Sequence, residues 1–187
     1  PEFELYTNSS THWSAGLGCA DCHMPFTRVG NYKISDHRIM SPLKNDFKAC
    51  IQCHSRDQDW LRERVRFIQD RAMSLYIRAG YATAVCAKLF EKLNAAKASG
   101  KTVDETLYAQ AREHYEQALY RLIFFSAENS IGFHNPPEAM RILGDSGRYA
   151  AKSEALLRQL LVKTGMEIPV EVDLELDRYL NQRGERK

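Results

Sequence analysis

The sequence predicts a mainly α-helical chain in which a loop-rich segment precedes long helices. Two observations predict this fold class. From Leu61 to Leu93, apolar or small residues recur at alternating spacings of three and four, which is the period of a helix seam. Residues 1–54 instead carry recurrent Ser, Thr, Asn, Gly and Pro without a persistent helical period. We therefore expect a loop-rich segment over residues 1–57 and a long-helix segment over residues 58–187, within one continuous domain.

Start and stop signals divide the long-helix segment. The capping sequence Ser55-Arg56-Asp57-Gln58 opens the first helix, and Gly100 ends it. Thr102-Val103-Asp104-Glu105 opens a second stretch of the same period, which runs to Gly132. Two long helices with a short connection pack side by side in opposite directions. The sequence thus predicts an antiparallel helical hairpin over about residues 58–131.

A third helix is predicted over about residues 136–164. Asn135 is a favourable N-cap and Pro136 a favourable first helical residue, and the apolar period then continues to Gly165. A polar tail follows. The first helix also has a second apolar face that needs a partner, so we expect a homodimer. That face consists of Tyr76, Ile77, Tyr81 and Val85.

Composition excludes several classes of partner. With 44% hydrophobic residues, the 187-residue chain can bury a core. Its 26 Lys and Arg against 24 Asp and Glu give a net charge of +2 without long like-charge runs, so no nucleic-acid partner is expected. No apolar stretch reaches about 18 residues, so no membrane span is expected. Because the chain starts at Pro1 without a signal peptide, we expect a processed or cut product.

The cysteines carry the strongest chemical signal. Four of the five lie in two C-x-x-C-H motifs, and Cys86 stands alone in the helix seam, where we expect a buried small residue. Two thiols at this spacing can each form a thioether to a porphyrin, and the next residue then places its imidazole on the iron. The motifs predict two covalent c-type haems, bound by Cys19, Cys22 and His23 and by Cys50, Cys53 and His54.

Two other interpretations of the cysteines compete with haem attachment. Two C-x-x-C half-sites can hold one tetrahedral zinc ion, but this leaves both adjacent histidines unexplained. A thioredoxin-like redox pair opens a helix after a strand in a βαβ unit, and no such pattern surrounds either motif.

Two haems have two further axial positions to fill. The remaining histidines are His12, His37, His114 and His134, and Met24 and Met40 offer sulfur. This surplus of histidine favours bis-His haems, which carry electrons and are closed to substrate, and the methionines are then expected to pack against porphyrin edges. His114 lies mid-helix near the seam and is expected to be structural. Asp36 is a candidate hydrogen-bond acceptor for the His37 imidazole.

These motifs, in this order, resemble the C-terminal part of the pentahaem cytochrome c nitrite reductases. The resemblance rests on both C-x-x-C-H motifs, on Asp36-His37 and on Gly132-Phe133-His134-Asn135-Pro136, and it extends from Pro1 to about Gly165. It implies that Cys19, Cys22 and His23 hold the fourth haem of the family, with His134 as distal ligand. Cys50, Cys53 and His54 would hold the fifth haem, with His12 distal, and His37 would serve a haem attached outside this chain.

The resemblance also implies the role of the whole protein. The active haem of the family has a C-x-x-C-K motif, which this chain lacks, so we assign no catalytic residue and expect a missing N-terminal part that also holds calcium. The whole protein would carry five haems and reduce nitrite to ammonium with six electrons. It would act in the periplasm or on the outer face of the cytoplasmic membrane and receive electrons from a membrane-anchored multihaem quinol dehydrogenase.

Two other functions stay open from the sequence. One is a stand-alone dihaem periplasmic electron carrier without catalysis. The other is part of an octahaem relative of the nitrite reductases, acting on nitrite, hydroxylamine or sulfite.

Overall fold

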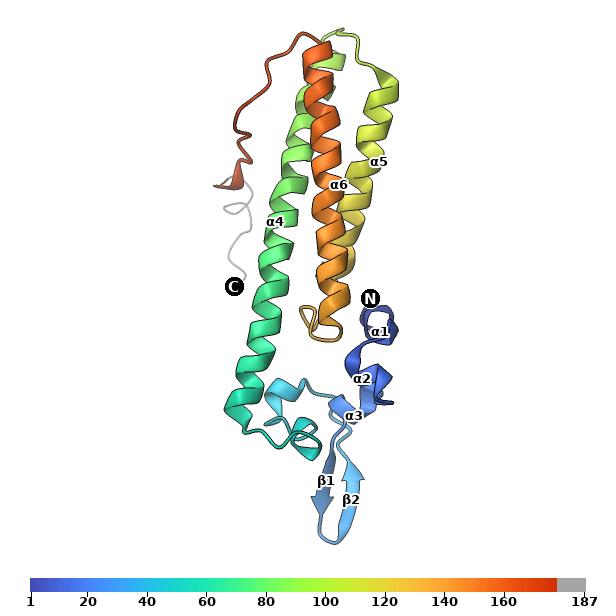
Figure 1. Cartoon of the computed structure of the whole chain (residues 1–187), viewed down its shortest axis with the longest axis vertical. Helices are drawn as coiled ribbons and strands as arrows, with labels where there is room; N and C mark the ends of the chain where they lie inside the picture. Colours follow the sequence, from blue (N-terminus) through green and yellow to red (C-terminus); the bar gives the residue numbers. More distant parts are fainter. Residues whose placement is uncertain (178–187) are drawn as a thin grey trace. The chain divides into compact units, whose positions relative to one another are not determined.

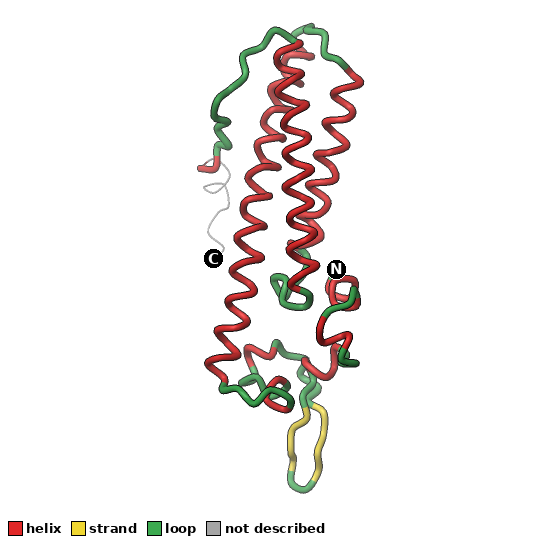
Figure 2. Tube along the Cα trace, viewed as in Figure 1, coloured by secondary structure: helices red, strands yellow, loops and turns green. Residues whose placement is uncertain are grey.

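The computed structural model describes residues 1–177 and is mainly α-helical (Figures 1 and 2). The prediction of the fold class is confirmed. The short elements of the N-terminal part are α1 (Glu2–Thr7), α2 (Thr11–Ser14), α3 (Cys19–His23), β1 (Phe26–Val29), β2 (Tyr32–Ser35) and two 3-10 turns, Pro42–Lys44 and Cys50–Gln52. The long helices are α4 (Gln58–Ala98), α5 (Glu105–Ser126) and α6 (Pro136–Lys163). Residues 178–187 of the predicted polar tail lie outside the described residues.

The chain divides into two compact units, which are described separately. The N-terminal unit comprises residues 1–74 and 125–141, and the helical unit comprises residues 75–124 and the chain from 142 onward. The boundaries fall inside the three long helices. The division predicted at residue 57 stays a prediction.

The long helices begin close to their predicted starts, but two of the caps differ. The carboxylate of Asp57 accepts a hydrogen bond from the Trp60 N–H at 2.7 Å, and that of Asp104 accepts one from the Leu107 N–H at 3.1 Å. The caps are thus the aspartates rather than the preceding Ser55 and Thr102, because a carboxylate both accepts the free N–H and interacts favourably with the helix dipole.

The third start signal is in place as predicted. Asn135 caps α6, since its side-chain oxygen accepts a hydrogen bond from the Glu138 N–H at 3.4 Å. Pro136 is the first residue of the helix. Gly144 and Gly147, which are compatible with a bend, lie within a helix that continues to Lys163.

The helical unit is a three-helix arrangement with a shared apolar core. The Ser146 hydroxyl donates to the Ala118 carbonyl at 2.9 Å, and the Ser153 hydroxyl donates to the Ala111 carbonyl at 2.8 Å. Because partner numbers fall on α5 as they rise on α6, these two helices are antiparallel. The core consists of Cys86, Leu89, Phe90, Leu93, Val103, Ala111, Ala118, Ala150, Leu157, Leu160 and Leu161.

The predicted hairpin of α4 and α5 is present in this unit. The Tyr108 hydroxyl donates to the Asn94 side chain at 2.7 Å, and Lys97 pairs with Glu105 at 2.8 Å. Cys86 on α4 is fully buried, and its thiol donates to the Ala150 carbonyl at 3.2 Å. The prediction of a buried small residue is confirmed. Burial raises the pKa of this thiol to about 11.

One apolar cluster of the N-terminal unit consists of buried Phe47, Leu61 and Val65, and the unit also buries Leu5, Tyr6, Ala72, Phe125 and Ala139. Polar contacts also join its segments. The Asn135 amide donates to the carbonyls of Leu5 at 3.0 Å and Asn8 at 2.8 Å, which fixes the first residues of the chain against the loop before α6.

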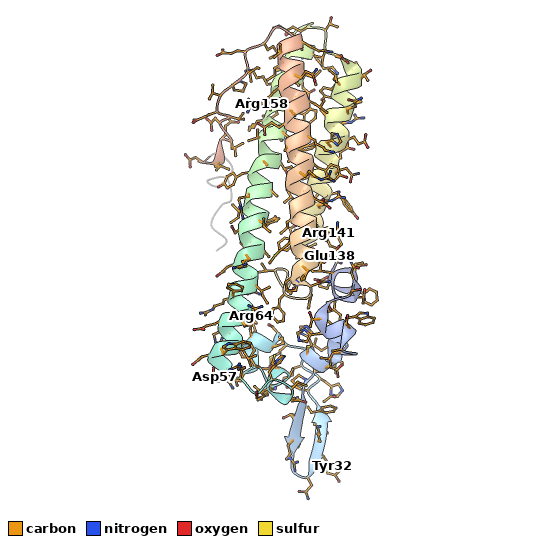
Figure 3. The ribbon with its side chains drawn as sticks, in the orientation of Figure 1. Tyr32, Asp57, Arg64, Glu138, Arg141 and Arg158 are labelled. Carbon is orange, nitrogen blue, oxygen red and sulfur yellow. The ribbon has the colours of Figure 1, made fainter. Side chains whose placement is uncertain are left out.

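A β hairpin in the N-terminal unit was not predicted. β1 and β2 pair antiparallel, with Phe26 opposite Ser35 and Val29 opposite Tyr32, and Gly30 takes a positive φ in the turn between them. The Gly30-Asn31 pair is the turn signal that could have revealed it. Tyr32 projects from the tip of the hairpin (Figure 3). In residues 1–177, no helix is both long and apolar enough to cross a membrane.

Candidate haem sites

The first C-x-x-C-H motif forms the short helix α3. The Asp21 carboxylate accepts a hydrogen bond from the Gly18 N–H at 2.7 Å, which closes the start of the turn. His23 follows Cys19 by four residues, so the two side chains lie on one side of the turn. The fold therefore places the thiol and the imidazole where one porphyrin could engage both.

The second motif has a similar local geometry. It begins with a 3-10 turn, and the His54 N–H donates to the Cys50 carbonyl at 2.8 Å. All four motif cysteines are free thiols and are exposed or half-buried, so they can react to form thioethers. Burial raises the pKa of the Cys22 and Cys50 thiols.

Each motif histidine faces a second histidine from a distant part of the sequence. The ring centres of His23 and His134 lie 6.1 Å apart, and those of His12 and His54 lie 6.3 Å apart. An imidazole binds a transition metal at about 2 Å, so two rings on opposite sides of one ion have centres about 6 Å apart. The two pairs therefore fit one axially ligated iron each.

Both rings of the His23–His134 pair have a hydrogen-bond partner at Nδ1. Nδ1 of His23 lies 3.1 Å from the Met40 carbonyl oxygen, and Nδ1 of His134 lies 2.6 Å from a Glu128 carboxylate oxygen. A ring that donates from Nδ1 keeps Nε2 unprotonated for a metal. With Nδ1 as the donor, both imidazoles could present Nε2 to a metal.

Glu128 is the site residue that the sequence reasoning missed. Its side chain is completely buried, and its carboxylate also accepts hydrogen bonds from the Ser130 N–H at 3.0 Å and the Gly132 N–H at 2.9 Å. Although burial alone would raise the pKa of Glu128, the hydrogen bonds from His134, Ser130 and Gly132 outweigh it and lower the pKa to about 2. An acidic residue in the Ser- and Gly-containing loop just before His134 was the available signal.

The His12–His54 pair has a different environment. His12 lies on the short helix α2, which Ser10 caps by accepting a hydrogen bond from the Trp13 N–H at 3.2 Å. Burial, and then the nearby His54, lower the pKa of His12. Both effects favour the neutral ring, which is the form that binds a metal.

Tyr6 lies between the surroundings of the two pairs. Its ring centre is 6.0 Å from that of His134 and 6.0 Å from that of Trp13, the neighbour of His12. Its hydroxyl donates to the Leu17 carbonyl at 2.7 Å. Tyr6 thus packs the first residues of the chain against both candidate sites.

The remaining histidines lie outside these pairs. His37 is exposed, and the neighbouring Asp36 carboxylate is engaged by Arg38 rather than by the His37 ring. The Arg38 guanidinium lowers the pKa of Asp36 to about 2. His114 packs beside Tyr149 in the helical unit, with ring centres 5.8 Å apart, which agrees with a structural role.

The geometry disfavours the two other interpretations of the cysteines. Within residues 1–177, no three His, Cys, Asp or Glu side chains gather as a metal site. The two strands of the described chain form an antiparallel hairpin, which is not the parallel unit that a thioredoxin-like motif requires.

Comparison with known proteins decides the family. The profile of the family described as cytochrome c552 matches residues 1–187, the whole chain. The chain belongs to the cytochrome c552 family. The resemblance inferred from the motifs is thereby confirmed, and membership of this family supports c-type haem as the cofactor.

Relatives within the cytochrome c552 family include known nitrite reductases. The chain is 39% identical over 159 residues to the cytochrome c nitrite reductase subunit NrfA of Nitratidesulfovibrio vulgaris, covering 82% of this chain and 30% of that protein. It is 31% identical over 165 residues to cytochrome c-552 of Bacteroides fragilis, covering 88% of this chain and 32% of that protein.

A solved structure shares the fold. This chain matches the catalytic subunit NrfA of the Desulfovibrio desulfuricans cytochrome c nitrite reductase, which is described with two calcium sites, at a TM-score of 0.80 and 32% identity. The match covers 94% of this chain and 36% of that subunit. This cytochrome c552 chain thus spans about a third of the length of the relatives it matches.

Proposed function

We propose that this chain is the electron-transfer part of an ammonia-forming cytochrome c nitrite reductase and carries two bis-His c-type haems. The observation that carries the proposal is the pairing of each motif histidine with a distant histidine, at ring separations of 6.1 and 6.3 Å. Similarity to NrfA supports the reaction class.

The residues have distinct roles in this proposal. Cys19 and Cys22 would attach one haem, with His23 as its proximal ligand and His134 as its distal ligand. Cys50 and Cys53 would attach the other haem, with His54 as its proximal ligand and His12 as its distal ligand.

The residues of the chain favour electron transfer over catalysis. When bound, haem supplies a one-electron redox centre. A haem held by a histidine on each face would offer no position for substrate, and the Met40 carbonyl and Glu128 hold the rings of the His23–His134 pair in orientation. Nitrite would therefore be reduced by six electrons to ammonium at a haem outside this chain, and this chain contributes no catalytic residue.

The whole protein would have further parts and partners. Exposed His37 would be the distal ligand of a haem attached elsewhere, in a set of five, and calcium would bind outside this chain. Ile77 and Tyr81 are exposed on α4 and would form part of a homodimer face. Because c-type haem is attached outside the cytoplasm, the protein would act in the periplasm, with a membrane-anchored multihaem quinol dehydrogenase as donor.

Haem stoichiometry and intact mass of the purified protein test this proposal, together with a nitrite-to-ammonium assay. Five haems per protein and ammonium production are expected. Two haems without nitrite reduction would overturn the proposal in favour of a stand-alone carrier. Eight haems would assign the chain to an octahaem relative.

A further inference from the structure

Glu128 holds His134 by a contact that loop formation alone does not require. The Ser130 and Gly132 N–H groups already satisfy the carboxylate in the manner of a tight turn, yet one of its oxygens also lies 2.6 Å from Nδ1 of His134. His134 is held at a second point as well, because its backbone N–H donates to the Ser130 hydroxyl at 2.9 Å. Both the backbone and the ring of His134 are therefore fixed.

The backbone that creates this arrangement is strained. Ile131 and Gly132 both have positive φ, at 55° and 80°. A β-branched residue such as Ile131 rarely adopts this conformation, and it persists where surrounding contacts impose it. At Gly132, an added Cβ would lie 3.0 Å from the Ala139 side chain and 3.1 Å from that of Ala72. The loop is thus confined between α4 and α6 within the N-terminal unit while it delivers two N–H groups to Glu128.

The buried charge of Glu128 forms no ion pair with a lysine or arginine of the described chain. Buried carboxylates are normally paired with a cation or a metal-bound group. The hydrogen bond between this carboxylate and Nδ1 of His134 becomes an ion pair only when that ring is protonated. A positive centre on the far side of the imidazole would complete this pairing.

We propose that Glu128 is a positioning residue that directs Nε2 of His134 to a haem iron and stabilises the ferric state of that haem. This inference rests on the ligation proposed above. A carboxylate that accepts the Nδ1 proton fixes the tautomer and increases electron donation from Nε2. Ferric iron carries one more positive charge than ferrous iron, so both the donation and the nearby charge lower the reduction potential of this haem.

The two haems should then differ. Within residues 1–177, neither His12 nor His54 has a carboxylate hydrogen-bonded to its ring, although both rings sit at a similar separation. Because the Glu128 contact lowers the reduction potential of the His23–His134 haem, the His12–His54 haem would have the higher reduction potential of the two.

The test is a redox titration of the haem-loaded protein carrying Glu128→Gln, followed optically and by low-temperature EPR. Gln keeps the size of the side chain and one acceptor oxygen, which can serve the Ser130 N–H and Nδ1 of His134, but it removes the charge and the second oxygen, which accepts from the Gly132 N–H. The potential of one haem should rise, with the ferric preference falling about tenfold, which equals about 59 mV for one electron. A His134→Ala variant identifies the signal of that haem.

The matched control is Glu138→Gln. Glu138 is an acid at the start of α6 in the same unit, paired with Arg141 at 2.6 Å (Figure 3), and its loss should leave every potential unchanged. Should the Glu128→Gln protein fail to incorporate haem, Glu128→Asp, which withdraws the carboxylate by one methylene, should give a smaller rise at the same haem.

The outcomes separate this inference from the proposed function. Unchanged potentials in the haem-loaded Glu128 variants would overturn the role of Glu128 and leave the ligation intact. If every haem stayed low-spin in the His134→Ala variant, the proposed ligation of a haem iron by His134 would itself be wrong.

Discussion

The interiors of the two units of this chain are stabilised in different ways. In the helical unit, Leu157, Leu160 and Leu161 are fully buried, and buried Ser146 and Ser153 donate to backbone carbonyls of α5. In the N-terminal unit, the four motif cysteines and the paired histidines are half-buried or exposed, and the apolar cluster that packs against Cys50 consists of Phe47, Leu61 and Val65. The comparison indicates that the helical unit supplies its own core, whereas the residues proposed to hold haem in the N-terminal unit are left half-buried or exposed by the polypeptide alone.

The largest effect should come from removing haem attachment. In a Cys50→Ala, Cys53→Ala protein, residues around the Phe47 cluster should lose amide protection, because the haem that fills their surroundings is absent. The α5 and α6 amides of the helical unit should keep theirs. Hydrogen exchange with mass spectrometry measures both.

A Cys86→Ala protein is the control for cysteine loss, since Cys86 lies in the helical core and should leave haem content unchanged. If the double variant protected the N-terminal unit as well as the wild type does, the cofactor-dependent account of this unit would be wrong.

A core truncation in the helical unit should be the next largest effect. Leu157→Ala removes a fully buried side chain and should lower the free energy of unfolding by about 4 kcal/mol. Val162→Ala on the same helix, at a position 58% exposed, should change it by less than about 1 kcal/mol. Urea denaturation followed by far-UV circular dichroism measures the difference, and equal losses would refute this account of the core.

Two glycines with similar backbones sharpen the comparison. Gly132 in the N-terminal unit and Gly100 in the helical unit have φ values of 80° and 88°. An added Cβ at Gly132 would contact Ala139 and Ala72, whereas at Gly100 it meets no described atom within 4 Å. We expect Gly132→Ala to cost about 3 kcal/mol and Gly100→Ala about 1 kcal/mol. Thermal unfolding of the two variants measures the difference. Equal losses in the free energy of unfolding would mean that the Gly132 loop is loosely packed, which would contradict this account.

The smallest effect concerns Cys86. Burial raises the pKa of its thiol from 9.0 to about 11, so the neutral thiol is favoured by the fold. The unfolded chain ionises first as pH rises, and the free energy of unfolding should therefore fall between pH 9 and 11. At about pH 8, Cys86 should resist iodoacetamide in the folded protein and react after unfolding in urea. Rapid alkylation of the folded protein would contradict its burial.

The sequence predicted the helices better than the site. The 3,4 periodicity of α4 and the helix start at Asn135 depend only on residues close in the sequence, so they can be recognised without knowledge of the fold. The capping residues are Asp57 and Asp104 rather than the predicted Ser55 and Thr102. Several possible acceptors lie within three residues of each helix start, and the local backbone geometry decides which of them accepts the free N–H.

The candidate haem sites could be predicted from the sequence only in part. The C-x-x-C-H motifs name their own cysteines and histidines, and the resemblance supplied the partners His12 and His134. The sequence did not predict the role of Glu128, because that role depends on a strained turn at Ile131 and Gly132. It did not predict the Met40 contact either, because this contact uses a backbone carbonyl, which no side-chain pattern reveals.

The most direct test of the central claim is the haem spin state in three single variants of the haem-loaded protein. His134→Ala and His12→Ala should each convert one haem from low-spin to high-spin in EPR and optical spectra, and the affected haem should differ between them. His114→Ala, which removes a histidine packed beside Tyr149, should convert none. If His134→Ala and His12→Ala left every haem low-spin, the two histidine pairs would not be the axial ligands.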